Sequence, residues 1–501
     1  MRSIGSLVLA VATLVAASAC RSPAEFTAVG PVRISFGTNR ALRAAIDSMA
    51  DAPEFANAHW GILVVDPERG DTLYSRNAGK LFMPASNMKI LTSATALTQL
   101  GADYRYRTVF SARGSVSNGT LNGDLLVVGR GDPSVSDHMF RDAMVPLRAV
   151  ADSIAARGIT RVTGRVVAAG DAFPDEVFGY GWTYDDFELS YSAPVDELLF
   201  NEGFNELHVH GGDRPGDSVR VDVRPSRSFP VVHITATTGP EPVGPDSARR
   251  RAHTLETRKD SANWTVTLFG QIAPHDSAIV EVTQHDPDQA YVAAFREALR
   301  DRGITIDDAP TDTLADVEPL VTLSSPPLRE ILNALMKPSQ NQIAEMLFRT
   351  LALEATGAGR ADSARSVIQR QLAAWGVTPD EAVIRDGSGL SRYDYVSPRT
   401  LVRILDAMRA SPNFAAYYDA LPIAGVDGTI RSRMKGTPAE NNVHAKTGSV
   451  ALARSLSGYV TTADHHMLIF SVLANNWTAN VRAIERVQDA IAVRLAAMTL
   501  R

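Results

Sequence analysis

The sequence predicts a multi-domain α/β protein, in which a large strand-rich segment interrupts a domain built from both ends of the chain. Its 501 residues are enough for about two to four domains. The composition, with 45% hydrophobic and 21% charged residues, is typical of a globular protein. Helical patterns occupy both ends, whereas short alternating segments separated by Gly, Pro, Asp and Asn fill residues 105–319. This arrangement indicates one domain that a large insertion divides into two parts.

The first part of the chain contains three expected elements. Residues 41–50 have a helical pattern, and residues 59–66 (HWGILVVD) are typical of a buried strand that ends at a turn. Residues 86–100 predict a helix that opens at Ser86, just after a proline. We expect this helix to hold the Ser86 hydroxyl at its start, because a strongly amphipathic run follows it.

The insertion and the last part of the chain differ in their pattern of hydrophobic residues. Within the insertion, segments such as YRTVFSA, GDLLVVG and WTVTLFG alternate as strands do, and we expect two subdomains there. From residue 326 the pattern turns helical, and the chain closes with two strand-like segments, 455–463 and 466–475, before a helix at 479–500. The predicted domain boundaries are 36–104 with 320–501 for the divided domain, and 105–319 for the insertion.

The charge balance and the cysteine count exclude several classes of protein and site. Acidic residues number 56 against 50 Lys and Arg, which gives a net charge of −6. Such a chain lacks the broad positive field that a phosphate backbone requires, so we expect no nucleic-acid partner. The single cysteine, Cys20, excludes a disulfide framework within the chain and a zinc site built from several thiolates.

The N-terminus has the pattern of an export signal. Arg2 supplies a positive end, an apolar run follows, and small residues precede Cys20, so residues 1–19 are typical of a secretory signal peptide. The residues before Cys20 resemble a bacterial lipoprotein lipobox, with Ala17 where leucine is usual, which predicts lipidation of Cys20. The alternative is an ordinary cleavage site that leaves the thiol unmodified. Either way we expect export to the periplasm or cell envelope, with residues 20–35 as a tether.

Ser86 and Lys89 form the first candidate catalytic pair. Residues three apart lie on one face of a helix, so the Ser86 hydroxyl and the Lys89 amine could meet. A serine is a poor nucleophile until a base takes its proton, and a partly buried lysine with a lowered pKa is such a base. The same spacing recurs at Ser432 and Lys435, but no apolar helix follows there to hold the pair. We therefore assign the nucleophile to Ser86.

Two further motifs place polar side chains beside a predicted helix and a predicted strand. Ser339 and Asn341 stand just before a helical stretch, where they could relay a proton and orient a substrate carbonyl; a helix cap is the alternative. Lys446, Thr447 and Gly448 come shortly before the closing strands. On an edge strand the lysine and threonine would grip a carboxylate, and the glycine would let a substrate backbone approach closely. A solvated turn is the alternative for this motif.

The order of these three motifs resembles one group of enzymes. Ser-x-x-Lys, then Ser-x-Asn, then Lys-Thr-Gly is the signature of penicillin-binding proteins and serine β-lactamases. About 250 residues separate the first two motifs, which resembles peptidase family S13, the D-alanyl-D-alanine carboxypeptidase/endopeptidase group of the penicillin-binding protein 4 type. Other stretches similar to that family are residues 129–133 (GRGDP), Gly181-Trp182 followed by Asp185-Asp186, and residues 386–392 (DGSGLSR).

The resemblance implies a fold and an activity. The fold would be a serine β-lactamase/transpeptidase-like domain, with an antiparallel sheet flanked by helices and a large insertion. The activity would be D-Ala-D-Ala carboxypeptidase or endopeptidase cleavage of peptidoglycan stem peptides through an acyl-enzyme. Penicillin and other β-lactam antibiotics would bind covalently and block it. We expect no metal and no organic cofactor in this mechanism.

By the same resemblance, the first two motifs carry defined roles. Ser86 would attack the carbonyl between two D-alanines, and Lys89 would be the general base for acylation. Ser339 would carry a proton toward the leaving amine, and Asn341 would hydrogen-bond the amide side of the substrate. The backbone N–H groups of Ser86 and Ser449 would form the oxyanion hole. The base used in deacylation stays open.

The remaining roles that the resemblance implies concern the two ends of the substrate. Lys446 and Thr447 would hold the terminal carboxylate, or the equivalent acid of penicillin. Residues of the insertion and of the Gly-Leu-Ser-Arg loop would bind the amino-bearing end of the stem peptide, with packing and solvated surface as their alternatives. The further substrate-binding candidates are Gly448, Ser449, Trp182, Asp185, Leu390 and Arg392.

Three other classes of protein are alternatives. A histidine-dependent serine hydrolase or a metallohydrolase is the first, but neither Gly-x-Ser-x-Gly nor His-Glu-x-x-His occurs in the chain. A non-catalytic penicillin-sensing envelope protein is the second, and the three intact motifs argue against it. A related β-lactamase or esterase is the third and stays open. The balance between carboxypeptidase and endopeptidase activity, the third residue of the stem peptide and the oligomeric state are likewise open.

Overall fold

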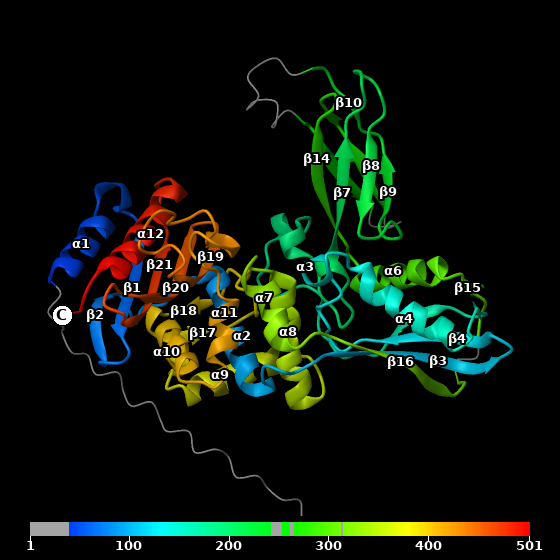
Figure 1. Ribbon diagram of the computed structural model, residues 1–501, viewed down its shortest axis with the longest axis horizontal. Helices are drawn as coiled ribbons and strands as arrows, with labels where there is room; N and C mark the ends of the chain where they lie inside the picture. Colours follow the sequence, from blue (N-terminus) through cyan, green and yellow to red (C-terminus); the bar gives the residue numbers. More distant parts are fainter. Residues whose placement is uncertain (1–39, 242–252, 261–264, 312–313, 501) are drawn as a thin grey trace, which may run out of the picture.

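The computed structural model describes residues 40–241, 253–260, 265–311 and 314–500 (Figure 1). The predicted signal peptide, Cys20 and the predicted tether lie outside these residues. Figure 1 shows three parts: the blue start and the red end of the chain lie together on the left, a cyan and green part extends to the right, and a green part stands upright above it. No helix in the described ranges is both long enough and apolar enough to cross a membrane.

A five-stranded antiparallel sheet joins the two ends of the chain. Its strands are β1 (His59–Asp66), β2 (Asp71–Arg76), β19 (His444–Val450), β20 (Ala453–Thr461) and β21 (Met467–Asn475). Their order is β19-β20-β21-β1-β2, so the start and the end of the chain meet where β1 pairs with β21. The Lys-Thr-Gly motif lies on β19, which is an edge strand as expected.

Helices cover both faces of this sheet, because β1 directs apolar side chains to each face in alternation. Ile62 and Val64 lie in one core with apolar residues of α1 (Arg40–Ala50) and α12 (Val481–Ala497). Leu63 lies in the core on the other face. The predicted α/β class, with an antiparallel sheet flanked by helices, is confirmed.

The helices on that other face come from both parts of the divided domain. The most buried is α2 (Met88–Leu100), which has no exposed side from Met88 through Leu97. It begins two residues later than the sequence predicts, because the turn that carries Ser86, η2 (Ala85–Asn87), has 3-10 geometry. The other elements of this layer are α7 (Leu328–Met336), α8 (Asn341–Thr356), α9 (Ala361–Ala374), α10 (Pro398–Arg409), α11 (Phe414–Ala420) and the short strands β17 (Ala382–Val383) and β18 (Tyr395–Val396).

The right-hand part in Figure 1 is a six-stranded sheet with helices packed on it. Phe110 of the sheet packs against Phe295, with 4.7 Å between the ring centroids. The sequence pattern of this part predicts strands and misses its two longer helices, Met144–Ala156 and Pro287–Asp301. Each helix interrupts the alternating pattern only briefly. The elements are β3 (Arg107–Ser117), β4 (Thr120–Val128), α3 (Asp137–Phe140), α4 (Met144–Ala156), β5 (Arg161–Val162), β6 (Val166–Ala169), α6 (Pro287–Asp301), β15 (Thr305–Ile306) and β16 (Val317–Ser324).

The predicted end of the insertion at residue 319 falls inside β16. This strand pairs with β3 as far as Ser324, and only then does the chain enter the helices of the divided domain. The sheet of the right-hand part therefore extends five residues beyond the boundary that the sequence predicts.

The upright part in Figure 1, which we call the upper subdomain, comprises the described residues of 204–283. Two three-stranded sheets, in the orders β14-β7-β8 and β11-β12-β9, share one core that includes Leu207 and Leu268. The strands are β7 (Phe204–His210), β8 (Arg220–Arg224), β9 (Val231–Ile234), β10 (Thr237–Thr238), β11 (Glu256–Asp260), β12 (Thr265–Phe269), β13 (Gln271–Ile272) and β14 (Ser277–Thr283).

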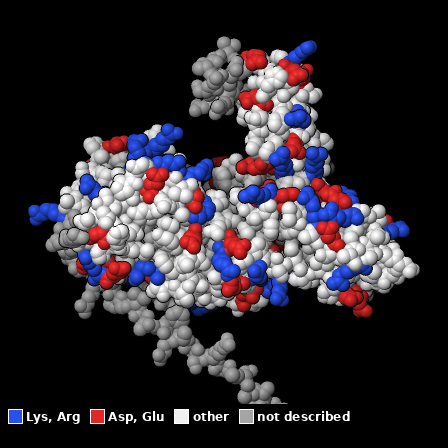
Figure 2. Space-filling view, viewed as in Figure 1, with Lys and Arg blue, Asp and Glu red and all other residues white. Residues whose placement is uncertain are grey.

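The face of the molecule seen in Figure 2 carries charges of both signs. Lys and Arg side chains lie among Asp and Glu side chains over all three parts, and no field of one sign covers this face. The surface is hollowed between the left-hand part and the upper subdomain.

Candidate active site

Ser86 lies on η2, the turn that precedes α2. The residue before it, Ala85, has a φ of +48°, a left-handed conformation that is uncommon outside glycine. Ser455 on β20 holds this turn, since its Oγ donates a hydrogen bond of 2.7 Å to Pro84 O. Such conformations persist only where the surrounding structure enforces them, and they cluster at functional sites. The candidate nucleophile is therefore fixed by a strand from the far end of the chain.

Lys89 lies one helical turn beyond Ser86 and is wholly buried. Its Nζ lies 3.0 Å from Ser86 Oγ, 2.6 Å from Asn341 Oδ1 and 2.9 Å from Ser388 O. Burial lowers the pKa of Lys89 to about 7, against the opposing effect of nearby acidic side chains. A neutral amine that donates to Asn341 and Ser388 directs its lone pair at the Ser86 hydroxyl, as a general base must.

The second Ser-x-x-Lys sequence has a different environment. Ser432 and Lys435 are both exposed, and they lie in turns that follow the short 3-10 helix η7 (Gly428–Ile430). Neither side chain is hydrogen-bonded to the other. The geometry of a nucleophile beside its base therefore occurs at Ser86 and not at Ser432.

Ser339 faces Lys446 and does not cap the helix that follows it. The cap of α8 is Gln340, whose side chain accepts a hydrogen bond from the first turn. Ser339 has a φ of +70°, and its Oγ accepts a hydrogen bond of 2.7 Å from Lys446 Nζ. The Lys446 side chain is wholly buried, and its Nζ also donates to Thr447 O at 3.0 Å. Burial, assisted by the charge of Lys89, lowers the pKa of Lys446 well below its ordinary value.

Asn341 uses both ends of its amide within the protein. Its Oδ1 accepts the hydrogen bond from Lys89, and its Nδ2 donates to the carbonyl of Tyr191 at 2.7 Å. Because the Tyr191 carbonyl must face the amide nitrogen, the amide oxygen must face Lys89. In this arrangement Asn341 orients Lys89, and because it also lines the cavity, its expected contact with a substrate amide stays a prediction.

Gly448 faces the nucleophile turn rather than the cavity. A Cβ at this position would lie 2.1 Å from Ser455 Oγ, 2.4 Å from Pro84 O and 3.0 Å from Ser86 N. Any side chain would push β19 away from η2. The expectation that Gly448 makes room for a substrate backbone is therefore corrected: the backbone that it admits is the turn carrying Ser86.

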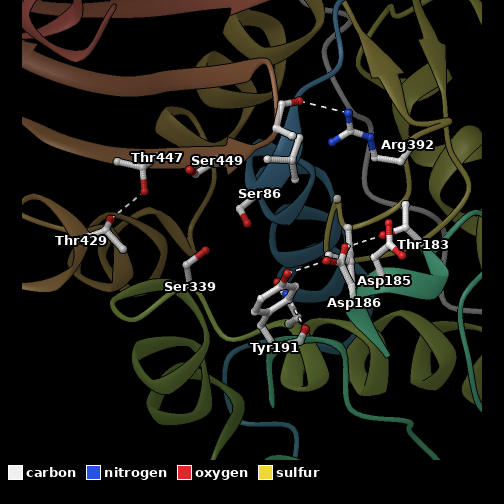
Figure 3. Close-up of a pocket in the computed structure, with 15 residues that line it drawn as sticks. Ser86, Thr183, Asp185, Asp186, Tyr191, Ser339, Arg392, Thr429, Thr447 and Ser449 are labelled. Carbon is white, nitrogen blue, oxygen red and sulfur yellow. Dashed lines mark hydrogen bonds between the residues drawn. The ribbon is translucent and has the colours of Figure 1, made fainter. Parts of the chain in front are cut away.

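A cavity of about 580 Å³ opens over Ser86 and brings most of the predicted site together (Figure 3). This volume lies in the usual range for small-molecule sites. In the close-up, Ser86 lies between Thr447 and Ser449 on one side and Asp185 and Arg392 on the other. The lining side chains that carry a hydroxyl group are Ser86, Thr183, Tyr191, Ser339, Thr429, Thr447 and Ser449.

The wall opposite Thr447 carries charged side chains. Asp185 is exposed and has no hydrogen-bond or ion-pair partner among the described residues, whereas Asp186 accepts a hydrogen bond of 2.6 Å from Thr183 Oγ1. Arg392 and the buried Leu390 also line this wall, and the guanidinium donates at 3.0 Å to the backbone of the β19–β20 turn. An unpaired carboxylate in this position suits a cationic group of a ligand.

Trp182 lies behind this wall and does not line the cavity. The side chain is 7% exposed, and its Nε1 donates to Asp386 Oδ2 at 3.0 Å. Asp386 also accepts hydrogen bonds of 2.7 Å from the backbone N–H groups of Gly389 and Ser391. In this structure Trp182 therefore supports the loop carrying Leu390, and its expected contact with the substrate stays a prediction.

The sequence motifs gave no signal for several residues of the site. Thr429 comes from η7, and its hydroxyl lies 2.7 Å from that of Thr447. Tyr191 supplies the carbonyl that orients the amide of Asn341. Glu345 is buried on α8, where it accepts a hydrogen bond of 2.7 Å from Ser388 N, and burial raises the pKa of its carboxyl group. An acid amid the apolar run QIAEMLF is a signal that could have identified Glu345.

Acidic side chains line the cavity, but they do not gather as metal ligands do. Among the residues that the structure describes, no group of three or more His, Cys, Asp and Glu side chains is placed to hold a metal ion. The expectation that the reaction needs neither a metal nor an organic cofactor stays a prediction.

Comparison with known proteins identifies the family to which this geometry belongs. The model of the D-Ala-D-Ala carboxypeptidase 3 (S13) family matches residues 42–498, which is most of the chain. The chain belongs to this family. The resemblance drawn from the three motifs is confirmed, and the enzyme is a serine-type D-Ala-D-Ala carboxypeptidase.

Individual relatives and a solved structure agree with this membership. The enzyme is 34% identical over 474 residues to the D-alanyl-D-alanine carboxypeptidase of Actinomadura sp. (strain R39), covering 91% of this chain and 84% of that protein. It is 26% identical over 446 residues to D-alanyl-D-alanine carboxypeptidase DacB of Haemophilus influenzae, covering 85% and 87%. The crystal structure of penicillin binding protein 4 from Haemophilus influenzae matches 91% of this chain and 99% of its own, with a TM-score of 0.74 and 22% identity, and so shows the same fold.

Proposed function

We propose that this S13 enzyme cleaves the D-Ala-D-Ala end of peptidoglycan stem peptides through an acyl-enzyme at Ser86. The observation that carries the proposal is the distance of 3.0 Å between Lys89 Nζ and Ser86 Oγ, together with a pKa of about 7 for Lys89. At neutral pH a large fraction of this amine is unprotonated and able to accept a proton. The names of the relatives, which are D-alanyl-D-alanine carboxypeptidases, support the same substrate.

In the acylation step, Lys89 takes the hydroxyl proton of Ser86 while Oγ attacks the carbonyl carbon between the two D-alanines. The negative charge on the carbonyl oxygen is held by the backbone N–H groups of Ser86 and Ser449. Collapse of this intermediate breaks the C–N bond, and the departing amine receives a proton through Ser339, which Lys446 hydrogen-bonds. Water then hydrolyses the ester and restores Ser86.

The two walls of the cavity bind opposite ends of the substrate. On the first wall, the hydroxyls of Thr447 and Thr429 face the terminal carboxylate, and the buried amine of Lys446 lies behind them. On the second wall, Asp185 pairs with the amino-bearing end of the stem peptide, and Arg392 borders it beside Leu390. A single D-alanine and a crosslinked neighbouring peptide are both leaving amines for this chemistry, so endopeptidase cleavage uses the same site.

β-Lactam antibiotics react at the same serine. A β-lactam ring presents a strained amide carbonyl and a nearby acid, which correspond to the scissile bond and the terminal carboxylate of the peptide. Support comes from the solved structure of the Haemophilus influenzae penicillin binding protein 4 complexed with a β-lactam, which has this fold. The ester formed at Ser86 blocks turnover for as long as water does not hydrolyse it.

The enzyme acts outside the cytoplasm. Residues 1–19 direct export, and lipidation of Cys20 ties the enzyme to a membrane of the cell envelope, with residues 20–35 as the tether. This placement brings the cavity to its cell-wall substrate.

The test of the nucleophile uses the second Ser-x-x-Lys sequence as its matched control. The purified full chain and the variants Ser86→Ala and Ser432→Ala are incubated with a fluorescent penicillin and with a pentapeptide that ends in D-Ala-D-Ala. We expect covalent labelling and D-alanine release from the wild type and Ser432→Ala, and neither from Ser86→Ala. Labelling of Ser86→Ala would overturn the assignment.

A further inference from the structure

The cavity wall opposite Thr447 is a segment without regular helix or strand, residues 183–193, which we call the acidic segment. It includes the short 3-10 turns η3 (Tyr184–Asp186) and η4 (Ser190–Ser192), and it contributes Thr183, Asp185, Asp186 and Tyr191 to the cavity. It contains three carboxylates and no lysine or arginine. Its position must therefore be set by contacts with other elements.

At its C-terminal end the acidic segment is held by α8. The buried side chain of Gln342 donates through Nε2 to the carbonyls of Ser190 at 3.0 Å and Ala193 at 3.2 Å. Asn341 donates to the carbonyl of Tyr191 at 2.7 Å. These bonds fix the end of the segment that orients Asn341, and they are independent of the upper subdomain.

At its middle the acidic segment is held by the upper subdomain. Lys259 on β11 places Nζ 2.6 Å from Glu188 Oε2, and Thr283 on β14 donates through Oγ1 to Glu188 O at 3.0 Å. Ser190 Oγ also donates to Glu281 on β14. Both three-stranded sheets of the upper subdomain therefore meet at Glu188, between Asp185 and the end fixed by α8.

The two side chains of the ion pair differ in exposure, and the burial of Lys259 distinguishes the pair from one on the surface. The Lys259 side chain is 11% exposed and that of Glu188 is 63% exposed. A pair of fully exposed side chains contributes little, but leaving the largely buried Lys259 without Glu188 would be costly, so the pair is expected to stay formed in the wild type. Without Lys259, Glu188 would keep its backbone bond to Thr283 and a contact of 3.9 Å between its Oε2 and His285 Nε2, and its charge would add to those of Asp185 and Asp186. The middle of the segment, and Asp185 with it, would then move from the cavity wall.

We infer that Lys259 and Glu188 are positioning residues that set the affinity of the enzyme for amine-bearing stem peptides. They touch no substrate; they act by holding Asp185 on the cavity wall. The inference rests on the proposed function, because it concerns the wall to which the amino-bearing end of the peptide is assigned. Since α8 separately fixes the end that orients Asn341, the chemistry at Ser86 is expected to persist when the pair is lost.

The experiment compares Lys259→Met with two variants in the full chain. Met keeps the length and apolar stem of lysine, so packing is retained. Arg258→Met is the matched control, because Arg258 is the exposed neighbour on β11 and forms no ion pair among the described residues. Lys259→Arg is the conservative rescue. The substrates are a D-Ala-D-Ala stem pentapeptide with a free side-chain amine, the same peptide with that amine acetylated, and a fluorescent penicillin.

We expect Lys259→Met to raise KM for the free-amine peptide by about fivefold. This is the lower end of the range by which one site of a protein changes the affinity of another. Its kcat, its KM for the acetylated peptide and its penicillin labelling should stay within about twofold of the wild type. Lys259→Arg should restore most of the affinity, and Arg258→Met should match the wild type. Equal KM values for Lys259→Met and Arg258→Met would overturn the inference, as would a parallel loss of penicillin labelling. A wild type that neither releases D-alanine nor labels would instead refute the proposed function.

Discussion

Lys446 donates a hydrogen bond of 2.7 Å to the Ser339 hydroxyl, and its side chain is wholly buried behind the cavity wall. The site thus contains two serine–lysine pairs, Ser86 with Lys89 and Ser339 with Lys446, and both lysines have lowered pKa values because they are buried. In the second pair the lysine is hydrogen-bonded to the serine that we propose as the carrier of a proton toward the leaving amine. This contact leads us to expect that Lys446 takes part in that proton transfer.

The first prediction concerns Lys446→Met. We expect kcat/KM for D-alanine release to fall by about 100-fold, the usual effect of losing a group that moves a proton. The thermal midpoint should not fall with it, because replacing a buried charge by an apolar side chain of similar size is often neutral or stabilising. Lys435→Met, at an exposed lysine, is the control and should behave as the wild type. Activity of Lys446→Met within about tenfold of the wild type would contradict the proton-transfer role.

The second prediction concerns the pH dependence of acylation. Lys89 must be neutral to accept the Ser86 proton, and its pKa is lowered to about 7. The acylation rate constant should therefore rise with pH, by about tenfold per unit below the pKa, and level off above it. The measurement is the rate of covalent labelling by a fluorescent penicillin across this range, with Ser432→Ala as the variant that should keep the profile. A rate that is flat, or that falls as the pH rises through 7, would speak against Lys89 as the base.

The third prediction concerns Gly448→Ala. The added methyl group would collide with Pro84 O and Ser455 Oγ, and we expect a loss of about 1–3 kcal/mol in the free energy of unfolding, as for other overpacked sites. Penicillin labelling should also fall, because η2 carries Ser86. Ser449→Ala is the neighbouring control: its side chain is exposed and its backbone N–H is kept, so both measurements should stay near the wild type. Unchanged thermal unfolding of Gly448→Ala would show that the close approach of β19 to η2 is wrong.

The fourth prediction separates support from substrate contact at Trp182. Trp182→Phe keeps a ring but removes the donor to Asp386, so we expect a loss of about 1–3 kcal/mol in the free energy of unfolding. Trp375→Phe is the control, because Trp375 is half-buried and its indole nitrogen has no hydrogen-bond partner among the described residues. Denaturant unfolding measures both variants. A Trp182→Phe variant with the stability of the wild type and a raised KM for peptide would favour direct contact with the substrate.

Local patterns predicted those elements whose residues carry an uninterrupted signal. The predicted strand 59–66 is β1, because a strand buried on both faces reads as a nearly continuous apolar run. The amphipathic α4 and α6 escaped prediction, since each is a single helix among many alternating segments. The boundary near residue 319 was misplaced because β16 is an outer strand whose side chains are mostly exposed or half-exposed.

The sequence by itself determined the three motifs, their order and the long gap between the first two, and these sufficed to predict the family and its chemistry. Only the tertiary structure decided which group each side chain meets: Lys446 faces Ser339, Asn341 joins Lys89 to the Tyr191 carbonyl, and Gly448 admits the nucleophile turn. The same holds for Trp182, which stands behind the wall. The physical reason is that these contacts join residues from separate elements that are brought together by the packing of α2, α8 and β19. A local sequence pattern reports the propensity and the exposed face of one element, and it carries no information on which distant element packs against it.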